Sequence, residues 1–231
     1  MPPLHRHQLA HLRAAGWAEV LERPWDATSR DCLRHWALRR LPLVVTRQLA
    51  EPGVAATTVS LGLPTPLAWG RRRIALQVPH SAIAWFDEFP AANAALRLFR
   101  GEARVRLQSL LDGLAALGTM ARVYGSHGWQ LLSGHAYLHE RSDLDLWISV
   151  AGSDQADAVA ACLQAFDTAR QPVDGELVFV EGAAVAWREW VVWRAGRARG
   201  LLVKRLHGAT LERDTPDAPL AGARREWARA A

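Results

Sequence analysis

The second half of the chain alternates between apolar runs typical of strands and apolar residues at helical spacing. One helical face is formed at three- and four-residue spacing by Leu107, Leu110, Leu111, Leu114 and Leu117. This face predicts a helical region over 91–117. We then predict strands over 121–124, 143–150, 173–180 and 200–206, and helices over 127–132 and 153–168. The segment 183–193 fits either state, because its Trp and Val residues permit both.

The first ninety residues read instead as short strands and turns. We predict strands over 41–48, 57–64 and 71–78, and a helix over 26–39. Possible N-caps are Asp26, Thr28 or Ser29 for this helix and Ser153 or Asp154 for the later one.

The two patterns together predict an α+β protein. We expect a small, mixed and β-rich N-terminal domain over 1–90 and an α/β domain over 91–210. The tail after His207 is rich in Asp, Pro, Ala and Arg, and we expect 211–231 to be loose.

The strand over 143–150 carries two acids in the run SDLDLWI. Side chains two residues apart in a strand point to the same face, so Asp143 and Asp145 project together while Leu144 and Leu146 enter a core. Two carboxylates on one face repel each other unless a cation lies between them. The pattern therefore favours a divalent metal with oxygen ligands, typically Mg²⁺ that also carries phosphates.

Further site residues come from the neighbouring predicted elements. Asp174 is the candidate for a third carboxylate, with Glu176 on the same face as the alternative; an Asp-Gly turn is the competing interpretation of Asp174. Gly125 and Ser126 stand at the start of a predicted helix, where backbone N–H groups and a hydroxyl can bind a phosphate. Lys204 could reach a triphosphate as a point charge, or it is a solvated strand lysine.

Other polar and aromatic residues carry weaker signals. Arg188 and Glu189 could form an ion pair that frames the site, or they lie on the surface. Among the eleven tryptophans, Trp129 or Trp187 could stack on a base, although core packing is the default for each.

The remaining histidines and cysteines suggest no metal site. We expect His5, His7 and His11 to be incidental, because no acidic or thiol partner lies near them in the sequence. Cys32 and Cys162 have no metal-type spacing and suit two buried thiols in a reducing cytosol.

The formal net charge of +5 comes almost wholly from arginine, since Lys204 is the only lysine. A positive field suits a polyanionic small substrate or an acidic partner as well as nucleic acid, and we do not expect nucleic acid. The run Arg71-Arg72-Arg73 fits a solvated turn, or a grip on phosphates or an acidic partner. The N-terminus lacks a signal-peptide pattern, and no apolar run approaches the ~20 residues that span a bilayer. We therefore expect a soluble, cytoplasmic protein.

The Gly-Ser turn, the SDLDL strand and the later Asp resemble the nucleotidyltransferase superfamily that includes DNA polymerase β. Four segments narrow the resemblance: RVYGSHGWQLLSGHAYLHERSDLDLWI, PVDGELVF, AVAWREW and LLVKRL. They are similar to the malonate decarboxylase holo-[acyl-carrier-protein] synthases, the phosphoribosyl-dephospho-CoA transferases. The N-terminal PLVVTRQ and VSLGLPTPLAWGRRRIAL also resemble this family, so the resemblance covers most of residues 5–207.

The resemblance implies a reaction. A serine of the decarboxylase's acyl-carrier protein attacks the α-phosphate of 2'-(5''-triphosphoribosyl)-3'-dephospho-CoA, and diphosphate leaves. Asp143 and Asp145 would bind Mg²⁺, and Asp174 would complete the site and help to deprotonate the serine. Gly125 and Ser126 would hold the leaving β- and γ-phosphates.

Two other functions remain open at this point. The chain could be a nucleotidyltransferase that uses an ordinary NTP on a small molecule or a protein hydroxyl. It could also be a non-catalytic fold that binds a polyanion, although the intact pair Asp143 and Asp145 argues against this. The matching N-terminal half favours the carrier-protein enzyme, with a citrate-lyase-type carrier as an alternative acceptor.

Overall fold

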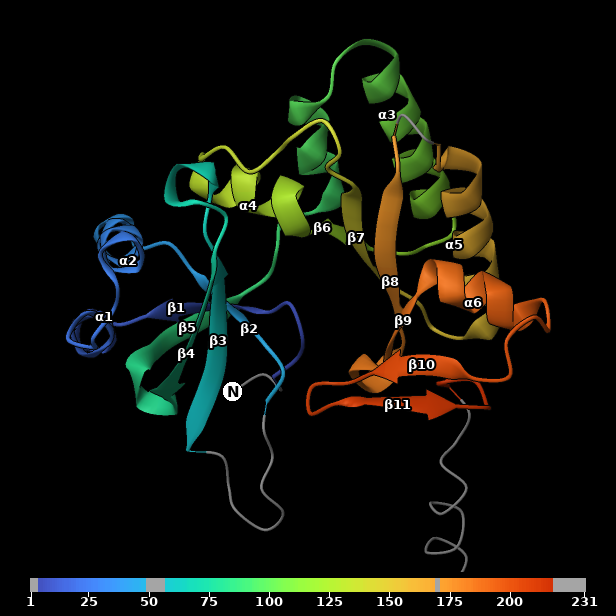
Figure 1. Cartoon of the computed structure of the whole chain (residues 1–231). Coiled ribbons are helices and arrows are strands. Elements are labelled where there is room, and N and C mark those ends of the chain that lie inside the picture. Colours follow the sequence, from blue (N-terminus) through green and yellow to red (C-terminus); the bar gives the residue numbers. More distant parts are fainter. Residues whose placement is uncertain (1–3, 49–56, 169–170, 218–231) are drawn as a thin grey trace, which may run out of the picture.

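The computed structural model describes residues 4–48, 57–168 and 171–217, and the strands in them form two separate sheets (Figure 1). One sheet is built from residues before 90, here called the N-terminal half. The other is built from residues after 90, here called the C-terminal half. Helices accompany both sheets, so the predicted α+β class is confirmed. No helix in the described residues is both long and apolar enough to cross a membrane.

The N-terminal sheet is antiparallel throughout, with the strand order β4-β3-β2-β1-β5. Its strands are β1 (Leu9–Leu12), β2 (Leu43–Val45), β3 (Thr58–Pro64), β4 (Arg73–Pro79) and β5 (Ile83–Asp87). Two α-helices and two short 3₁₀ helices join them: α1 (Ala14–Leu21), α2 (Ala27–Arg39), η1 (Leu67–Trp69) and η2 (His80–Ala82). The predicted strands and the predicted helix are confirmed, although β2 is only three residues long.

The predicted N-cap of α2 is Asp26, whose carboxylate accepts hydrogen bonds from the backbone N–H groups of Thr28 and Ser29. The sequence pattern did not reveal β1, α1 and β5. These elements are short, and β1 exists because it pairs with both β2 and β5. Such pairings depend on residues more than thirty positions away, which local periodicity does not report.

The C-terminal sheet has the strand order β11-β10-β9-β8-β7-β6, in which only β7 and β8 are parallel. Its strands are β6 (Ala121–Val123), β7 (Leu144–Ser149), β8 (Val173–Val178), β9 (Ala184–Ala186), β10 (Leu201–Lys204) and β11 (Ala209–Glu212). Its helices are η3 (Ala92–Leu98), α3 (Gly101–Ala116), α4 (Gly125–Ser133), α5 (Ser153–Phe166), η4 (Val180–Gly182) and α6 (Trp187–Arg194).

Several predicted boundaries in this half need correction. The region 91–117 is split into η3 and α3, and α4 begins at Gly125 rather than at His127. The N-cap of α5 is Gly152, not Ser153 or Asp154. The segment 183–193, for which the sequence allowed a strand or a helix, forms the strand β9 and then the helix α6.

The expected loose tail is wrong for its first residues. Ala209–Glu212 pairs along its whole length with β10, and Arg205 forms an ion pair with Glu212 across the hairpin. Further on, Asp217 accepts hydrogen bonds from the backbone N–H and the hydroxyl of Ser153. Residues 218–231, the rest of that prediction, lie outside the described residues.

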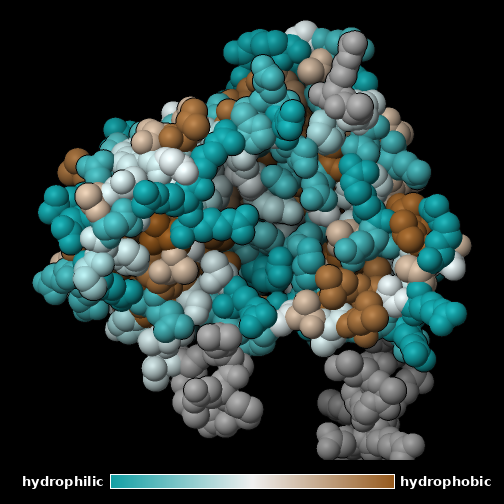
Figure 2. Space-filling view, viewed as in Figure 1, coloured by the Kyte–Doolittle hydropathy of each residue, from teal (hydrophilic) through white to brown (hydrophobic). Residues whose placement is uncertain are grey.

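The two faces of β7 have different neighbours. Leu144, Leu146 and Ile148 are buried in the core of the C-terminal half, which α3 and α5 complete on that side of the sheet (Figure 1). The residues between them face the other way, toward the N-terminal half. Between the two halves the surface is hollowed, and hydrophilic residues line the hollow (Figure 2). The acidic positions of β7 and β8 therefore lie on the face that this hollow opens.

The halves also share apolar contacts beside the hollow. Trp129 and Tyr137 belong to the core of the N-terminal half, although they follow the expected boundary near residue 90. The Trp129 ring meets Phe89 edge-on at 5.5 Å between centroids, and the Tyr137 hydroxyl donates to the carbonyl of Pro64 at 2.8 Å. These contacts hold α4 and the loop after it against the N-terminal sheet.

Candidate active site

Two of the three predicted aspartates are direct neighbours on adjacent strands. In the parallel register of β7 and β8, Asp145 lies opposite Asp174. Adjacent strands are about 4.8 Å apart and paired residues share a face, so the two carboxylates project side by side. Asp143 is the residue immediately before β7, and it is exposed. It lies two residues before Asp145, so the two side chains are on the same face of the sheet. The structure thus brings all three aspartates to one end of one sheet face.

The predicted Gly-Ser turn lies against these acids. Gly125 begins α4 with a φ of +57°, and a Cβ atom at this position would lie 1.8 Å from Oδ2 of Asp145. The residue must therefore be glycine for two reasons, its left-handed backbone and the carboxylate that occupies the side-chain space. The start of α4 and the acidic strand end form one site.

Burial and like charge act together on Asp145. Burial is the largest cause that raises the pKa of its carboxyl to about 7, and the charges of Asp174 and Asp143 raise it further. A backbone hydrogen bond from Ser126 acts in the opposite direction. The carboxyl of Asp145 is therefore partly protonated near neutral pH.

A divalent cation fits this donor set. Three carboxylates supply the hard oxygen ligands that Mg²⁺ prefers, and a cation would relieve the repulsion that raises the pKa of Asp145. The cage is not preformed: within residues 4–48, 57–168 and 171–217, no three His, Cys, Asp or Glu side chains converge closely enough to hold a metal ion. The Asp145 carboxylate is turned to Gly125 instead. Asp143, Asp145 and Asp174 are the residues that would hold the cation.

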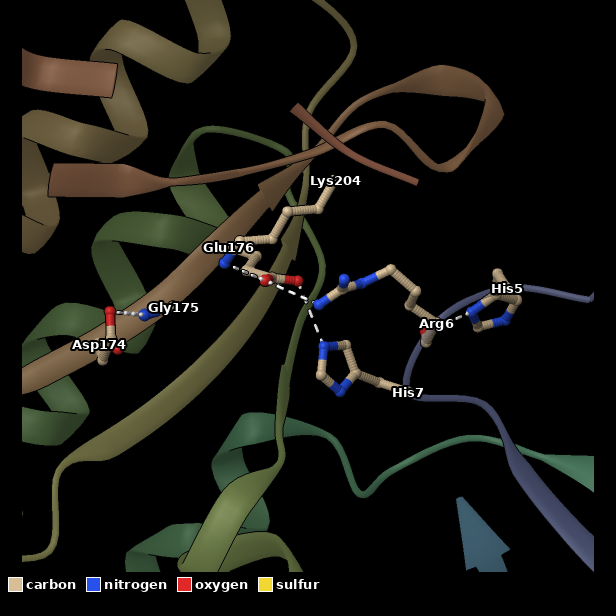
Figure 3. Close-up of polar contacts among 7 residues, drawn as sticks. All are labelled: His5, Arg6, His7, Asp174, Gly175, Glu176 and Lys204. Carbon is tan, nitrogen blue, oxygen red and sulfur yellow. Dashed lines mark hydrogen bonds and ion pairs between the residues drawn. The ribbon is translucent and has the colours of Figure 1, made fainter. Parts of the chain in front are cut away.

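The alternative third carboxylate, Glu176, already accepts hydrogen bonds from three other side chains. Its side chain is 6% exposed, and it accepts hydrogen bonds from Arg6 at 3.1 Å, from His7 at 3.2 Å and from Lys204 at 3.0 Å (Figure 3). Burial alone would raise its pKa, but the hydrogen bond from His7 and the surrounding positive charges hold it at about 2. Asp174, which lies two residues earlier on the same strand and is exposed, is therefore favoured as the third acid (Figure 3).

This network changes the interpretation of two predicted features. Lys204, expected on a triphosphate, pairs with Glu176. His5 and His7 are not incidental, because His7 bonds Glu176 and His5 bonds Glu88 at 2.7 Å. Their acidic partners are 83 and 169 residues away in the chain, so a search of the local sequence could not find them.

Arg6 was missed altogether, and the sequence offered no signal for it beyond its position between two histidines. The third histidine, His11, stacks its ring on Trp85 with 4.5 Å between centroids.

The tryptophan candidates lie in the core, and Arg188 lies at the edge of the site. Trp129 and Trp187 are both buried, so core packing is the correct interpretation and the proposed stacking on a base is wrong for these two. Arg188 lies 4.4 Å from the ring of Trp187 and pairs at 2.7 Å with Asp167, not with Glu189, which is exposed. Arg188 also donates to the carbonyl of Val173, next to Asp174.

The remaining candidates lie elsewhere. Arg72 pairs with Asp26 on the surface, and Arg71 to Arg73 are all exposed, which agrees with the solvated interpretation, although Arg73 already belongs to β4. Cys32 is buried and Cys162 is partly buried, and both are free thiols.

Substitution of Gly125 tests the contact with Asp145. Gly125→Ala should remove transfer activity, because its new methyl group and the Asp145 carboxylate require the same space. Gly134→Ala is the matched control: Gly134 ends the same helix with a φ of +74°, but no atom lies within 4 Å of its Cβ position. Both variants should lose about 1 kcal/mol to the left-handed backbone. Activity assays and thermal melting of the two side by side check this, and an active Gly125→Ala variant would refute the contact.

Two protein-family models together match almost the whole chain. The model described as phosphoribosyl-dephospho-CoA transferase MdcG N-terminal domain matches residues 5–89, and that of the MdcG C-terminal domain matches residues 91–215. The chain belongs to this family. The resemblance inferred from the motifs is thereby confirmed, and the chain is an enzyme of the transferase type.

Curated members of the phosphoribosyl-dephospho-CoA transferase family are similar over most of their length. The protein with this name from Bradyrhizobium diazoefficiens is 36% identical over 211 residues, which are 90% of this chain and 90% of that protein. Its namesake from Xanthomonas campestris pv. campestris is 35% identical over 210 residues, 89% of this chain and 92% of that protein. No solved structure shows significant similarity to the chain.

Proposed function

We propose that this enzyme transfers the phosphoribosyl-dephospho-CoA group of 2'-(5''-triphosphoribosyl)-3'-dephospho-CoA to a serine of the malonate decarboxylase acyl-carrier protein. Family membership supports the transferred group, since the curated relatives are named phosphoribosyl-dephospho-CoA transferases. The observation that carries the chemistry is the contact between Gly125 and Asp145, with Asp174 paired beside them. A phosphate-binding helix start and a set of carboxylates then meet at one point, as transfer of a phosphoryl-linked group requires.

In this proposal each group at the site has one task. The serine oxygen attacks the α-phosphorus, a P–O bond forms, and the bond from the α-phosphorus to the bridging oxygen of the diphosphate breaks. Asp174, which is exposed and lies opposite Asp145, accepts the serine proton. The N–H groups at the start of α4, beginning at Gly125 and Ser126, bind the departing diphosphate. Bound Mg²⁺ would supply neutralisation of the charge on the phosphates.

The same proposal assigns the N-terminal half to contact with the carrier protein. The family model for the N-terminal domain matches residues 5–89, whereas the aspartates and Gly125 all lie in the C-terminal half. The N-terminal half contacts the C-terminal sheet through Arg6 and His7, which both bond Glu176. Its exposed arginines, such as those of α2 and Arg71–Arg73, suit an acidic carrier protein.

The decisive experiment measures the intact mass of the carrier after incubation with the enzyme, Mg²⁺ and one donor at a time. The carrier should gain the whole phosphoribosyl-dephospho-CoA unit from its triphosphoribosyl donor, and little or nothing from ATP. A carrier with alanine at the acceptor serine should gain neither. If ATP adds an AMP-sized mass as readily, the enzyme is a general nucleotidyltransferase and the proposal is wrong.

A further inference from the structure

His127 is a buried titratable side chain that none of the roles assigned above uses. It stands two residues after Gly125 in α4, and its Nδ1 atom lies 3.1 Å from the backbone carbonyl oxygen of Asp143. Asp143 is a candidate metal ligand, whereas Gly125 begins the helix that is proposed to bind phosphate. The contact therefore joins the two parts of the candidate active site.

The position of His127 in its helix explains how the ring reaches Asp143. His127 is the third residue of α4, and side chains in a helix tilt toward its N-terminus. The start of α4 already lies against β7, since the backbone N–H of Tyr124 donates to the carbonyl of Asp145 at 3.0 Å. A side chain that points back from the first turn thus meets the residue two positions before Asp145, which is Asp143.

The hydrogen bond between His127 and Asp143 has a defined direction. Burial lowers the pKa of His127 to about 4, although the bond to Asp143 acts in the opposite direction, so the ring is neutral near pH 7. A neutral imidazole carries one N–H, and a carbonyl oxygen can only accept. Nδ1 is therefore the protonated nitrogen, and His127 donates to Asp143.

The His127 ring is itself held by an aromatic neighbour. It stacks on Phe99 with 5.3 Å between centroids and only 7° between the ring planes. Phe99 lies in the segment between η3 and α3, so this support comes from outside both α4 and β7. Burial and stacking together restrict the ring, and Nδ1 stays aimed at the carbonyl of Asp143.

Asp143 depends on this hydrogen bond because β7 begins only at the next residue. Within residues 4–48, 57–168 and 171–217, the contact with His127 is the one hydrogen bond that Asp143 makes. On the other side, the N–H of Leu144 donates to the carbonyl of Pro172 at 3.0 Å, just before β8. The peptide group between Asp143 and Leu144 is thus held from both sides, by α4 and by the residues that lead into β8.

We propose that His127 is a positioning residue that holds Asp143 in place to bind the divalent cation. This inference rests on the metal ligands of the proposed function, but on neither its donor nor its acceptor. Asp143 is exposed, and a free residue at a strand end loses conformational freedom when it binds a cation. With its peptide group held by His127, Asp143 loses less of this freedom. Loss of a hydrogen bond that fixes a metal ligand typically lowers metal affinity about 10- to 100-fold.

Two substitutions of His127 separate the hydrogen bond from packing. His127→Asn retains an N–H donor close to the position of Nδ1 but removes the ring, so it should lower the melting temperature through the space left beside Phe99. His127→Phe retains a ring against Phe99 but has no donor. Calorimetric titration of the full-length protein with Mg²⁺ at pH 8, without donor or carrier, measures the effect. His127→Phe should bind Mg²⁺ on the order of tenfold more weakly than the wild type, and His127→Asn nearly as well as the wild type.

His11→Phe is the matched control, because His11 stacks on Trp85 in the N-terminal sheet, and its Mg²⁺ affinity should equal that of the wild type. Wild-type affinity in His127→Phe, equal losses in both His127 variants, or no Mg²⁺ binding by the wild type overturns the inference. Should His127→Phe fail to fold by thermal melting, His127→Gln takes its place, since its amide lies at the Nε2 position, away from the carbonyl of Asp143. The expected Mg²⁺ affinities without carrier labelling support the role of His127 and contradict the proposed reaction.

Discussion

Asp145→Asn should abolish transfer to the carrier and yet make the metal-free protein more stable at pH 8. The loss follows from the position of Asp145, which touches Gly125 and lies opposite Asp174. A metal that neutralises phosphate charge contributes several kcal/mol to the transition state, and each 1.4 kcal/mol is about a factor of ten. The rate of diphosphate release should therefore fall by a factor on the order of 10³.

The gain in stability follows from the raised pKa of Asp145. An unfolded chain ionises this carboxyl near pH 4, whereas burial and the neighbouring acids delay ionisation in the folded protein to about pH 7. Between these values the unfolded state binds fewer protons, so the wild type loses stability as the pH rises through this window. The asparagine variant avoids that loss. In a chelator, its melting temperature should exceed that of the wild type at pH 8, and the two should converge below about pH 4.

Two comparisons make the result decisive. Asp112→Asn, an exposed acid on α3 away from the site, should change neither property. Addition of Mg²⁺ should stabilise the wild type at pH 8 but leave Asp145→Asn almost unaffected. Near-normal turnover by Asp145→Asn, or a melting temperature below that of the wild type at pH 8, would show that Asp145 is not a metal ligand under electrostatic strain.

The acidic end of the site was accessible to sequence reasoning because its geometry is local. The alternation in SDLDLWI fixes which residues of β7 face the core, and those leucines and the isoleucine are indeed buried. Asp174 begins a second apolar run one helix later, and such βαβ units place their strands side by side. The observed register of Asp145 with Asp174 is the result.

The other end of the site depends on contacts that no local pattern contains. The partners Arg6 and Glu176 are 170 residues apart, and they meet where the N-terminal half contacts the C-terminal sheet. Lys204 and Glu176 meet because β9 alone separates their strands in the sheet order. For the same reason the sequence could not assign Trp129, whose ring lies in the core of the half that precedes it. Burial, rather than residue type, decides between stacking on a ligand and packing in a core.

The sequence did not predict the short elements for a related reason. Helix propensity and period identify α3 and α5, which have 16 and 14 residues, whereas β11 has four residues and is largely exposed. Its pairing with β10 supplies the stability that its composition does not suggest. The segment 183–193 was ambiguous because it contains a strand and a helix in direct succession.

The second large effect concerns the connection between the halves. Glu176→Gln should lower the melting temperature at pH 7 by on the order of 10 °C. The variant removes the carboxylate charge that contacts Arg6, His7 and Lys204, and it leaves the positive charges of Arg6 and Lys204 close together beside a buried amide. Breaking a buried ion pair in this way typically costs about 3–5 kcal/mol, and for a chain of this size each kcal/mol shifts the melting temperature by about 2–4 °C. Glu212→Gln is the matched control, since Glu212 pairs with Arg205 near the surface and such pairs contribute about 1 kcal/mol or less.

The pH dependence of this effect distinguishes charge from packing. The pKa of Glu176 is about 2 in the folded protein, below its ordinary value near 4.5, because the cations around it outweigh the effect of burial. Its ionisation therefore stabilises the fold fully above about pH 4.5, and this stabilisation is lost as the pH falls toward 2. The difference in melting temperature between wild type and Glu176→Gln should thus be largest at pH 6–8 and should shrink at pH 3. A difference that is equally large at both pH values would mean that the glutamine disturbs packing, and that the ionic network does not join the N-terminal half to the catalytic sheet.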